Sequence, residues 1–379
     1  MRHLLPLLCG LLLAACGQRA ARLIDAVTTE IYTPRYASGF EITGAAGSRS
    51  TLVTVHNPWY GDEVTDQYLF IARDGEPAPA GFEGQVLRDE ARRVVCMSGS
   101  YIAMLDALGA ADRVVGVSGA QYLINETLRR RIARGEAADV GFDSNVDFER
   151  LMALRPDLVM LFGIGGADTA LTGKLRELGI PYLYMGEHCE ESPLGKSEWV
   201  VVAAEIAGLR TEGSRLFAAI PERYERLRAL AQQTAARPRV MLNTPYRDTW
   251  FMPARNSYMV RLLEDAGARY VFEENTATQT LPIDIEQAYY LTSKSDFWLN
   301  VSGCNTLDEV RRQNPRLADT PPVREGRVYD NNRRRNAAGG SDFWESGVLR
   351  PDRVLADLVH IFHPELSETD ELYYYRQLE

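Results

Sequence analysis

The sequence contains few cysteines and few histidines, five of each in 379 residues. Beyond the N-terminal region, the cysteines Cys96, Cys189 and Cys304 are widely spaced and odd in number. This spacing fits neither a disulfide framework nor a zinc motif, so buried free thiols are expected. The histidines are too scattered for the several-histidine site that a bare transition metal requires. We therefore expect no metal site made of side chains and no cofactor.

The sequence also lacks an excess of positive charge and the short motifs of common enzymes. Lysine and arginine total 42 against 52 aspartates and glutamates, which gives a formal net charge of −10. This balance argues against general nucleic-acid binding. The sequence has no Gly-x-Ser-x-Gly elbow, P-loop or HExxH motif, and Gly163–Gly166 lacks the full spacing of a dinucleotide-binding loop. We therefore expect a protein that is not an enzyme, with a bilobed chelatase-like enzyme as a distant alternative.

Long apolar runs are absent except at the N-terminus, where residues 4–13 form one. Leu-Ala-Ala-Cys follows at positions 13–16. A short apolar core before small residues is typical of a secretion signal, and it is too short to span a membrane. Leu-Ala-Ala-Cys resembles the bacterial lipobox, whose cysteine carries lipid. Residues 1–16 are therefore predicted to be a lipoprotein signal peptide, with Cys16 as the lipidation site and a periplasmic, membrane-anchored mature chain.

The rest of the chain divides into four parts by the periodicity of its apolar residues. Residues 17–92 are rich in Thr, Val, Tyr and Phe between turn residues, which predicts a β-rich extension. Strands alternate with helices over 93–191 and again over 237–379, which indicates two parallel α/β lobes. We expect strands at 94–97, 114–117, 158–162 and 181–185, and then at 239–243, 270–272, 296–301 and 328–329.

The two α/β sets are joined by residues 192–236, where apolar residues recur at three- and four-residue steps. This spacing predicts a helical linker. Pro221 lies inside its second helix and is expected to kink that helix or split off its first turn.

The two lobes share an internal repeat. Val-Asp-Phe-Glu at 146–149 matches Ile-Asp-Ile-Glu at 283–286, and each is followed by an apolar strand that begins with aspartate. The two glutamates are 137 positions apart and the opening strands 146, in the same order of elements. The sequence therefore predicts two similar lobes with a cleft between them.

Several segments resemble the class III (helical-backbone) periplasmic substrate-binding proteins of ABC importers. The resemblance covers about residues 90–363 and rests on RVVCMSGSYIAMLDALGAADRVVGVSG, VDFERLMALRPDLVML, KLRELGIPYLYM and PIDIEQAYYLTSKSDFWLNV. HCEESPLGKSEW and GGSDFWESGVLRPDRVLADLVHIFHPEL are similar to a lipoprotein subgroup from Bacteroidetes-type bacteria. The family includes carriers of ferric siderophores, haem and vitamin B12.

This resemblance implies two Rossmann-like lobes joined by a long helical linker. It implies a carrier that captures an iron complex, a ferric siderophore or haem, in the interlobe cleft and delivers it to an ABC permease. A corrinoid cargo is the alternative. We expect the carrier to be a monomer, and the β-rich extension is not part of the family pattern.

The resemblance also implies one glutamate near the tip of each lobe that docks onto arginines of the permease. Glu149 and Glu286 occupy the matching positions. Two acidic groups held at a fixed separation can steer docking and set its register. The alternative is that both are ordinary first-turn glutamates stabilised by the helix dipole.

Ligands of α/β sheets gather beyond the carboxyl ends of the strands. There the loops 97–101, 244–255 and 330–344 carry aromatic and basic residues outside clear helices or strands. Aromatic rings offer flat apolar contact, and arginines hold anionic groups with paired hydrogen bonds. The candidate ligand-binding residues are Tyr101, Tyr246, Trp250, Phe251, Arg255, Arg333, Arg334, Arg335 and Trp344. Core packing of Trp250 and Phe251, and a solvated loop for the three consecutive arginines, remain alternatives.

Overall fold

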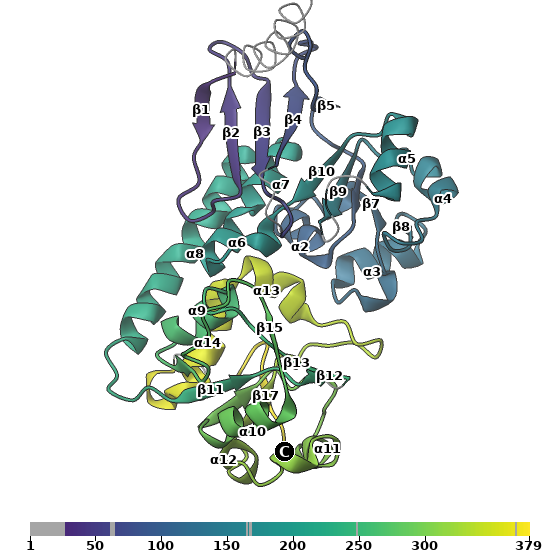
Figure 1. Cartoon of the computed structure of the whole chain (residues 1–379). Coiled ribbons are helices and arrows are strands. Elements are labelled where there is room, and N and C mark those ends of the chain that lie inside the picture. The colour runs from purple at the N-terminus through teal and green to yellow at the C-terminus, as the bar shows by residue number, and fades with distance from the viewer. Residues whose placement is uncertain (1–26, 61–64, 164–165, 167–168, 248, 368–369) are drawn as a thin grey trace, which may run out of the picture.

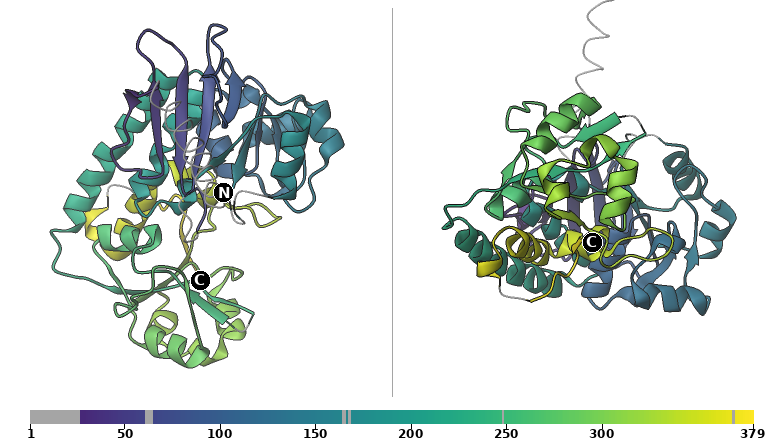
Figure 2. Two further views of the ribbon diagram at one scale, coloured as in Figure 1. Left: turned by 45° about the horizontal axis from the view of Figure 1, so that its top comes forward. Right: turned by 90° about the horizontal axis from the view of Figure 1, so that it is seen from below.

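The structure is a computed structural model that describes residues 27–60, 65–163, 166, 169–247, 249–367 and 370–379. It consists of an N-terminal antiparallel sheet, two α/β lobes and a set of connecting helices (Figure 1). The sheet and lobe one lie side by side at one end of the molecule, and lobe two lies at the other (Figure 2). The fold class predicted from the sequence is confirmed.

The N-terminal sheet has the strand order β1-β2-β3-β4-β5, antiparallel except for the parallel pair β4 and β5. Its strands are β1 (Thr29–Tyr32), β2 (Phe40–Gly44), β3 (Thr51–His56), β4 (Asp66–Ala72) and β5 (Gln85–Arg88). Val53 and Val55 on one face join the core cluster that contains Trp199, whereas Leu52 on the other face packs with Phe70. Both faces of β3 are therefore covered, which explains its nearly continuous apolar run.

Lobe one contains a parallel sheet in the order β10-β9-β6-β7-β8. Its strands are β6 (Val94–Cys96), β7 (Val114–Val117), β8 (Ala138–Asp139), β9 (Leu158–Phe162) and β10 (Tyr182–Met185). Its helices are α2 (Gly99–Ala107), α3 (Glu126–Ala133), α4 (Phe148–Ala153) and α5 (Ala170–Leu178). Numbered within the lobe, the strand order is 3-2-1-4-5, as in doubly wound sheets.

Lobe two repeats this order without the third strand, because its sheet runs β14-β11-β16-β17 and ends with antiparallel β18. Its strands are β11 (Arg239–Leu242), β14 (Arg269–Tyr270), β16 (Phe297–Leu299), β17 (Val328–Asp330) and β18 (Arg376–Gln377). Its helices are α9 (Tyr258–Asp265), α10 (Ile285–Ser293), α11 (Leu307–Gln313), α12 (Pro321–Arg324), α13 (Ser346–Leu349) and α14 (Pro351–Phe362). A small sheet of β12 (Pro245–Tyr246), β13 (Thr249–Met252) and β15 (Leu281–Ile283) is added to it.

The internal repeat extends to individual hydrogen bonds. Asp147 accepts a hydrogen bond from the Arg150 amide at 2.9 Å, and Asp284 accepts one from the Gln287 amide at 2.8 Å. Each aspartate caps a helix that leads into the strand beside the first strand of its lobe. An N-terminal aspartate satisfies amides that have no partner within the helix. The two lobes are thus built on the same local plan.

The connecting helices are α6 (Pro193–Glu198), α7 (Val200–Ile206) and α8 (Arg210–Ala231). The residues of α7 are all buried, and α8 packs against both α7 and α14. The predicted split at Pro221 is wrong, since α8 runs through this residue as one helix. Buried Phe217, Ile220 and Tyr224 on the same helix stabilise it by packing, which outweighs one missing backbone hydrogen bond. No helix among the described residues is long and apolar enough to span a membrane.

Candidate functional site

The carboxyl ends of the lobe-one strands carry a buried acidic residue, Glu187, in the segment after β10. It is 2% exposed, and its Oε1 accepts a hydrogen bond from the Ser100 hydroxyl at 2.9 Å. Oε2 makes no hydrogen bond to a described residue. The Tyr101 hydroxyl acts to lower the pKa of Glu187. Burial is the largest influence: it outweighs the lowering effects of the Lys196 ammonium and the Tyr101 hydroxyl, and it raises the pKa of Glu187 to about 7. This carboxyl group is therefore poised to change charge near neutral pH.

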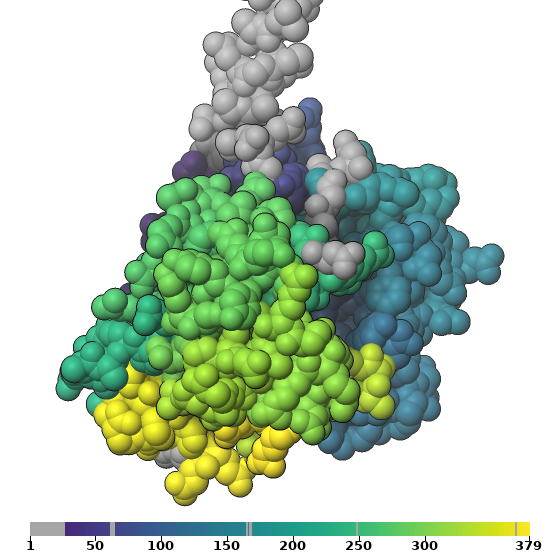
Figure 3. Space-filling view, turned by 60° about the horizontal axis from the view of Figure 1, so that its bottom comes forward, coloured from purple at the N-terminus to yellow at the C-terminus, as the bar shows by residue number. Residues whose placement is uncertain are grey.

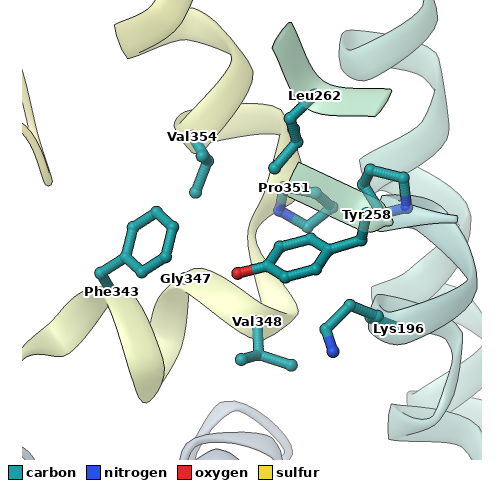
Figure 4. Close-up of a pocket in the computed structure, with 9 residues that line it drawn as sticks. Lys196, Tyr258, Leu262, Phe343, Gly347, Val348, Pro351 and Val354 are labelled. Atoms are coloured by element: carbon teal, nitrogen blue, oxygen red, sulfur yellow. The ribbon is translucent and has the colours of Figure 1, made fainter. Parts of the chain in front are cut away.

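Lys196 of α6 connects this edge with lobe two. Its Nζ donates to the Glu187 carbonyl oxygen at 3.0 Å and lies 4.6 Å from the centre of the Tyr258 ring. Burial lowers the pKa of Lys196, and Glu187 acts in the opposite direction. Figure 4 shows the Tyr258 ring between Phe343 on one side and Lys196 on the other, with Val348 beneath it. The cavity among them is about 10 Å³, the space of one water molecule, so no cargo fits there.

The carboxyl end of lobe two also holds buried polar atoms without partners. Asp330 Oδ1 and Asn332 Nδ2 make no hydrogen bond to a described residue. Burial raises the pKa of Asp330 to about 6, against the opposite effects of the Asn331 amide and Arg376. An unpaired buried polar atom is costly unless water or a ligand contacts it. Both sheets therefore place polar groups at the edge where α/β proteins bind ligands.

The segment after β17 holds the two edges together. The Glu345 carboxylate accepts hydrogen bonds from the amides of Ile124 at 2.6 Å and Asn125 at 2.9 Å in lobe one. Asn336 Nδ2 donates to the carbonyl oxygens of Gln121 at 2.9 Å and Leu123 at 3.1 Å. In the space-filling view, the yellow-green surface of this segment reaches the blue surface of lobe one across the furrow between the lobes (Figure 3).

Two glycines allow this close approach. A side chain at Gly340 would place a Cβ atom 1.7 Å from the Tyr122 carbonyl oxygen, and one at Gly99 would lie 2.7 Å from Glu345 Cγ. Gly99 begins α2, three residues after the end of the first strand of lobe one. The interlobe contact is therefore made by the loops at the carboxyl ends of both sheets.

Two predicted ligand-binding residues lie in the core rather than at the surface. Tyr101 is fully buried, and its hydroxyl donates to the Leu161 carbonyl at 3.2 Å. Trp250 is 1% exposed and stacks on Trp298 with 5.6 Å between the ring centroids. The segment around Trp250 is a β-hairpin rather than a loop, so alternate residues point inward.

The remaining predicted aromatic residues are at the surface. Tyr246, Phe251 and Trp344 are 67%, 40% and 55% exposed. Trp344 packs edge-on against Phe343 and precedes Glu345, which places it next to the interlobe contact. Lobe one adds the exposed pair Tyr122 and Phe142, whose ring centroids are 6.3 Å apart. The sequence did not indicate this pair, because the two residues lie in separate loops.

Most of the predicted ligand-binding arginines already have carboxylate partners. Arg255 pairs with Glu264, Arg333 with Glu371 at 2.8 Å, and Arg334 with Asp342 at 2.6 Å. Arg334 also lies over the Tyr373 ring at 4.6 Å. Arg335 is exposed and has no ion pair with a described residue. Of the four, Arg335 is therefore the arginine best placed to hold an anionic ligand.

The two candidate docking residues lie on the surface. Glu149 in the first turn of α4 is exposed and has no ion pair with a described residue. Glu286 in the first turn of α10 pairs with Arg316 at 2.9 Å, with the two side chains 72% and 65% exposed. Such an exposed pair is weak and exchanges readily for another partner. Cys16 lies outside the described residues. Cys96, Cys189 and Cys304 are free thiols; Cys96 and Cys304 are buried, as predicted, whereas Cys189 is only partly buried.

Comparisons with known proteins show the family and the fold of this chain. A family model described as periplasmic binding protein matches residues 94–333. An uncharacterized lipoprotein of Methanocaldococcus jannaschii is 25% identical over 332 residues, covering 82% of this chain and 77% of that protein. A periplasmic heme-binding protein from Pseudomonas aeruginosa has a TM-score of 0.58 at 19% identity, covering 76% of this chain and 98% of its own. An ABC-type Fe3+-hydroxamate transport protein from Saccharomonospora viridis has a TM-score of 0.54 at 17% identity, covering 72% and 94%.

Proposed function

The chain belongs to the periplasmic binding protein family, and we propose that it is the solute-binding lipoprotein of an ABC importer. It captures an iron complex, a ferric siderophore or haem, between its lobes and delivers it to the membrane permease. One observation carries this proposal: the carboxyl edges of two like α/β sheets meet at one interface, through Glu345 and the lobe-one segment at Ile124. Ligands of such sheets bind at these edges.

The chemistry of the interface suits a flat, partly anionic cargo. Trp344, Tyr122 and Phe142 supply exposed aromatic surface beside the contact between the lobes. Arg335 supplies a guanidinium that can hold a carboxylate or a catecholate with paired hydrogen bonds. The similar structures named above, a heme-binding protein and a Fe3+-hydroxamate transport protein, support an iron complex over a corrinoid.

Delivery depends on docking, for which Glu149 and Glu286 are the proposed contacts. Each lies in the first turn of the equivalent helix of its lobe, so their separation is set by the relative position of the lobes. Fixed acidic groups of this kind can set the register of a complex with basic partners.

The anchor is proposed to be a lipid on Cys16, which places the mature protein outside the cytoplasm at a bacterial membrane. The lipoprotein name of the archaeal relative supports this assignment. Membership of the Bacteroidetes-type lipoprotein subgroup stays a prediction, as does the monomeric state.

The test is calorimetric titration of the protein lacking residues 1–16 with haemin, a ferric hydroxamate chelate, cyanocobalamin and free ferric ion. We expect saturable binding of one of the two iron complexes at submicromolar concentration. Binding of cyanocobalamin alone would establish the corrinoid alternative. The absence of binding to all four would contradict the proposed function.

A further inference from the structure

The N-terminal sheet precedes the region matched by the family model, residues 94–333. It is nevertheless held by direct contacts to the segment 187–198, which contributes Glu187 and Lys196 to the candidate site. Its two loops β1–β2 and β3–β4 lie at the same end of the sheet, which points toward the linker and the lobes (Figure 1). The contacts of these loops indicate what the sheet contributes.

The β1–β2 loop is held by two buried carboxylates, Glu190 just before the linker and Glu198 at the end of α6. Glu198 accepts hydrogen bonds from the amides of Arg35, Tyr36 and Ala37 at 2.7–2.8 Å. Glu190 accepts bonds from the amides of Ser38 and Gly39 at 2.9–3.0 Å. A carboxylate with several amide donors forms strong, directional bonds. The sheet is thereby fixed to the segment that also carries Glu187 and Lys196.

The β3–β4 loop covers part of the carboxyl edge of lobe one. The Pro58 carbonyl oxygen lies so close to Gly163, which follows β9, that a Cβ atom there would be 2.6 Å away. Trp59 packs edge-on against Tyr184 of β10, with 5.4 Å between the ring centroids. These contacts fix the loop over the ends of two lobe-one strands.

The next residue, Tyr60, is fixed by a hydrogen bond, and its side chain is nevertheless exposed to solvent. Its hydroxyl donates to the His188 carbonyl oxygen at 2.7 Å, and its ring lies edge-on to the His188 ring at 5.9 Å. It is still 68% exposed, the most exposed of the large apolar and aromatic side chains on the described surface. The segment that holds Tyr60 is the one that carries Glu187, the buried carboxyl group at the carboxyl edge of lobe one. Tyr60 therefore lies where the N-terminal sheet meets the carboxyl edge of lobe one.

We propose that residues 58–60, which follow β3, form a third wall of the ligand site and that Tyr60 contacts the cargo through its ring. This inference rests on the proposed function as a cargo-binding protein. Because the hydroxyl already donates to the main chain, the tyrosine offers a fixed, flat apolar face with little rotational freedom to lose on binding. Such a face suits a planar or apolar part of the cargo. The N-terminal sheet thus contributes to recognition in addition to the two lobes.

The test compares Y60A and Y60F with the control Y289A, which removes an exposed tyrosine of α10. Each protein lacking residues 1–16 is titrated with haemin, a ferric hydroxamate chelate and cyanocobalamin, and thermal melting confirms folding. For the probe that the wild type binds, we expect Y60A to raise the Kd about tenfold, because the ring contact is lost. Y60F keeps the ring and is expected to stay within about twofold, as is Y289A.

Equal Kd values for Y60A and wild type would overturn the inference and leave the proposed function intact. If the wild type binds none of the probes, the proposed function fails and the inference fails with it. A similar loss in Y289A would also overturn the inference, because the effect would then not be specific to this loop.

Discussion

The Glu345 carboxylate of lobe two accepts a hydrogen bond from the Ile124 amide of lobe one at 2.6 Å. The carboxylate is 6% exposed, and burial raises its pKa to about 7, while the amides of Ile124 and Asn125 act to lower it. Asp342 raises this pKa further and Arg129 lowers it. A contact between the lobes therefore involves a group that titrates near neutral pH.

This relationship predicts a pH-dependent stability. The pKa of Glu345 in the folded protein lies above the ordinary 4.5 of a glutamate. The stability associated with this group is therefore complete below pH 4.5 and is lost as the pH rises through about 7. We expect E345Q to lower the slope of melting temperature against pH between roughly pH 5 and pH 8. Melting followed by circular dichroism, with the exposed-site variant E212Q as control, measures this slope; parallel slopes for wild type and E345Q would contradict the prediction.

The attachment of the N-terminal sheet predicts a large effect at Glu198. Replacing it by alanine leaves the amides of Arg35, Tyr36 and Ala37 without an acceptor. We expect E198A to lower the free energy of unfolding by roughly 3 kcal/mol. Hydrogen exchange should speed up first in residues 29–44. E222A, at an exposed position of α8, is the matched control, and exchange in E198A as slow as in E222A would disprove the role of this carboxylate.

The two predicted cleft tryptophans should behave differently in fluorescence. Trp344 is 55% exposed, whereas Trp250 is 1% exposed and donates through Nε1 to the Leu242 carbonyl at 2.9 Å. We expect W344F to reduce the fluorescence change on ligand binding without loss of stability. W250F should keep that change but lower the free energy of unfolding by about 1–3 kcal/mol, because packing and a buried hydrogen bond are lost. The opposite pattern would place the cargo away from Trp344.

The docking proposal predicts that charge reversal separates binding from transport. E149K combined with E286K should leave the Kd for the cargo within about twofold, because both residues are exposed and outside the interlobe contact. Association with the permease should weaken at least tenfold and lose its salt dependence. Reversal of the control pair Glu212 and Glu222 on α8 should have no such effect. Unchanged transport in the double variant would show that these glutamates are ordinary first-turn residues.

Several elements could be predicted from the sequence with their observed bounds. The strands 114–117 and 158–162 are formed as expected. Each depends on an apolar run, a local pattern that acts over a few residues. The repeat was visible for the same reason, because Asp147 and Asp284 cap their helices through amides only three residues away.

The candidate site could be predicted only in part. Trp250 and Phe251 are neighbours in an aromatic and basic segment, and nothing in the sequence says that one is buried and the other 40% exposed. Pairing of β13 with β12 and β15 decides which side chain faces the core. Tyr101 follows a predicted strand end, yet its position in α2 turns it into the core beneath Glu187.

The sequence by itself determined the class of the fold, the repeat and the order of the elements, because these follow from periodicities and caps within single elements. Only the tertiary structure decided which residues form the site. Glu198 and Ala37 are 161 residues apart, and Tyr60 and His188 are 128 apart. Contacts over such separations leave no local pattern, since they depend on how whole elements pack together. The proposed role of the N-terminal sheet likewise rests on contacts between its loops and distant parts of the chain.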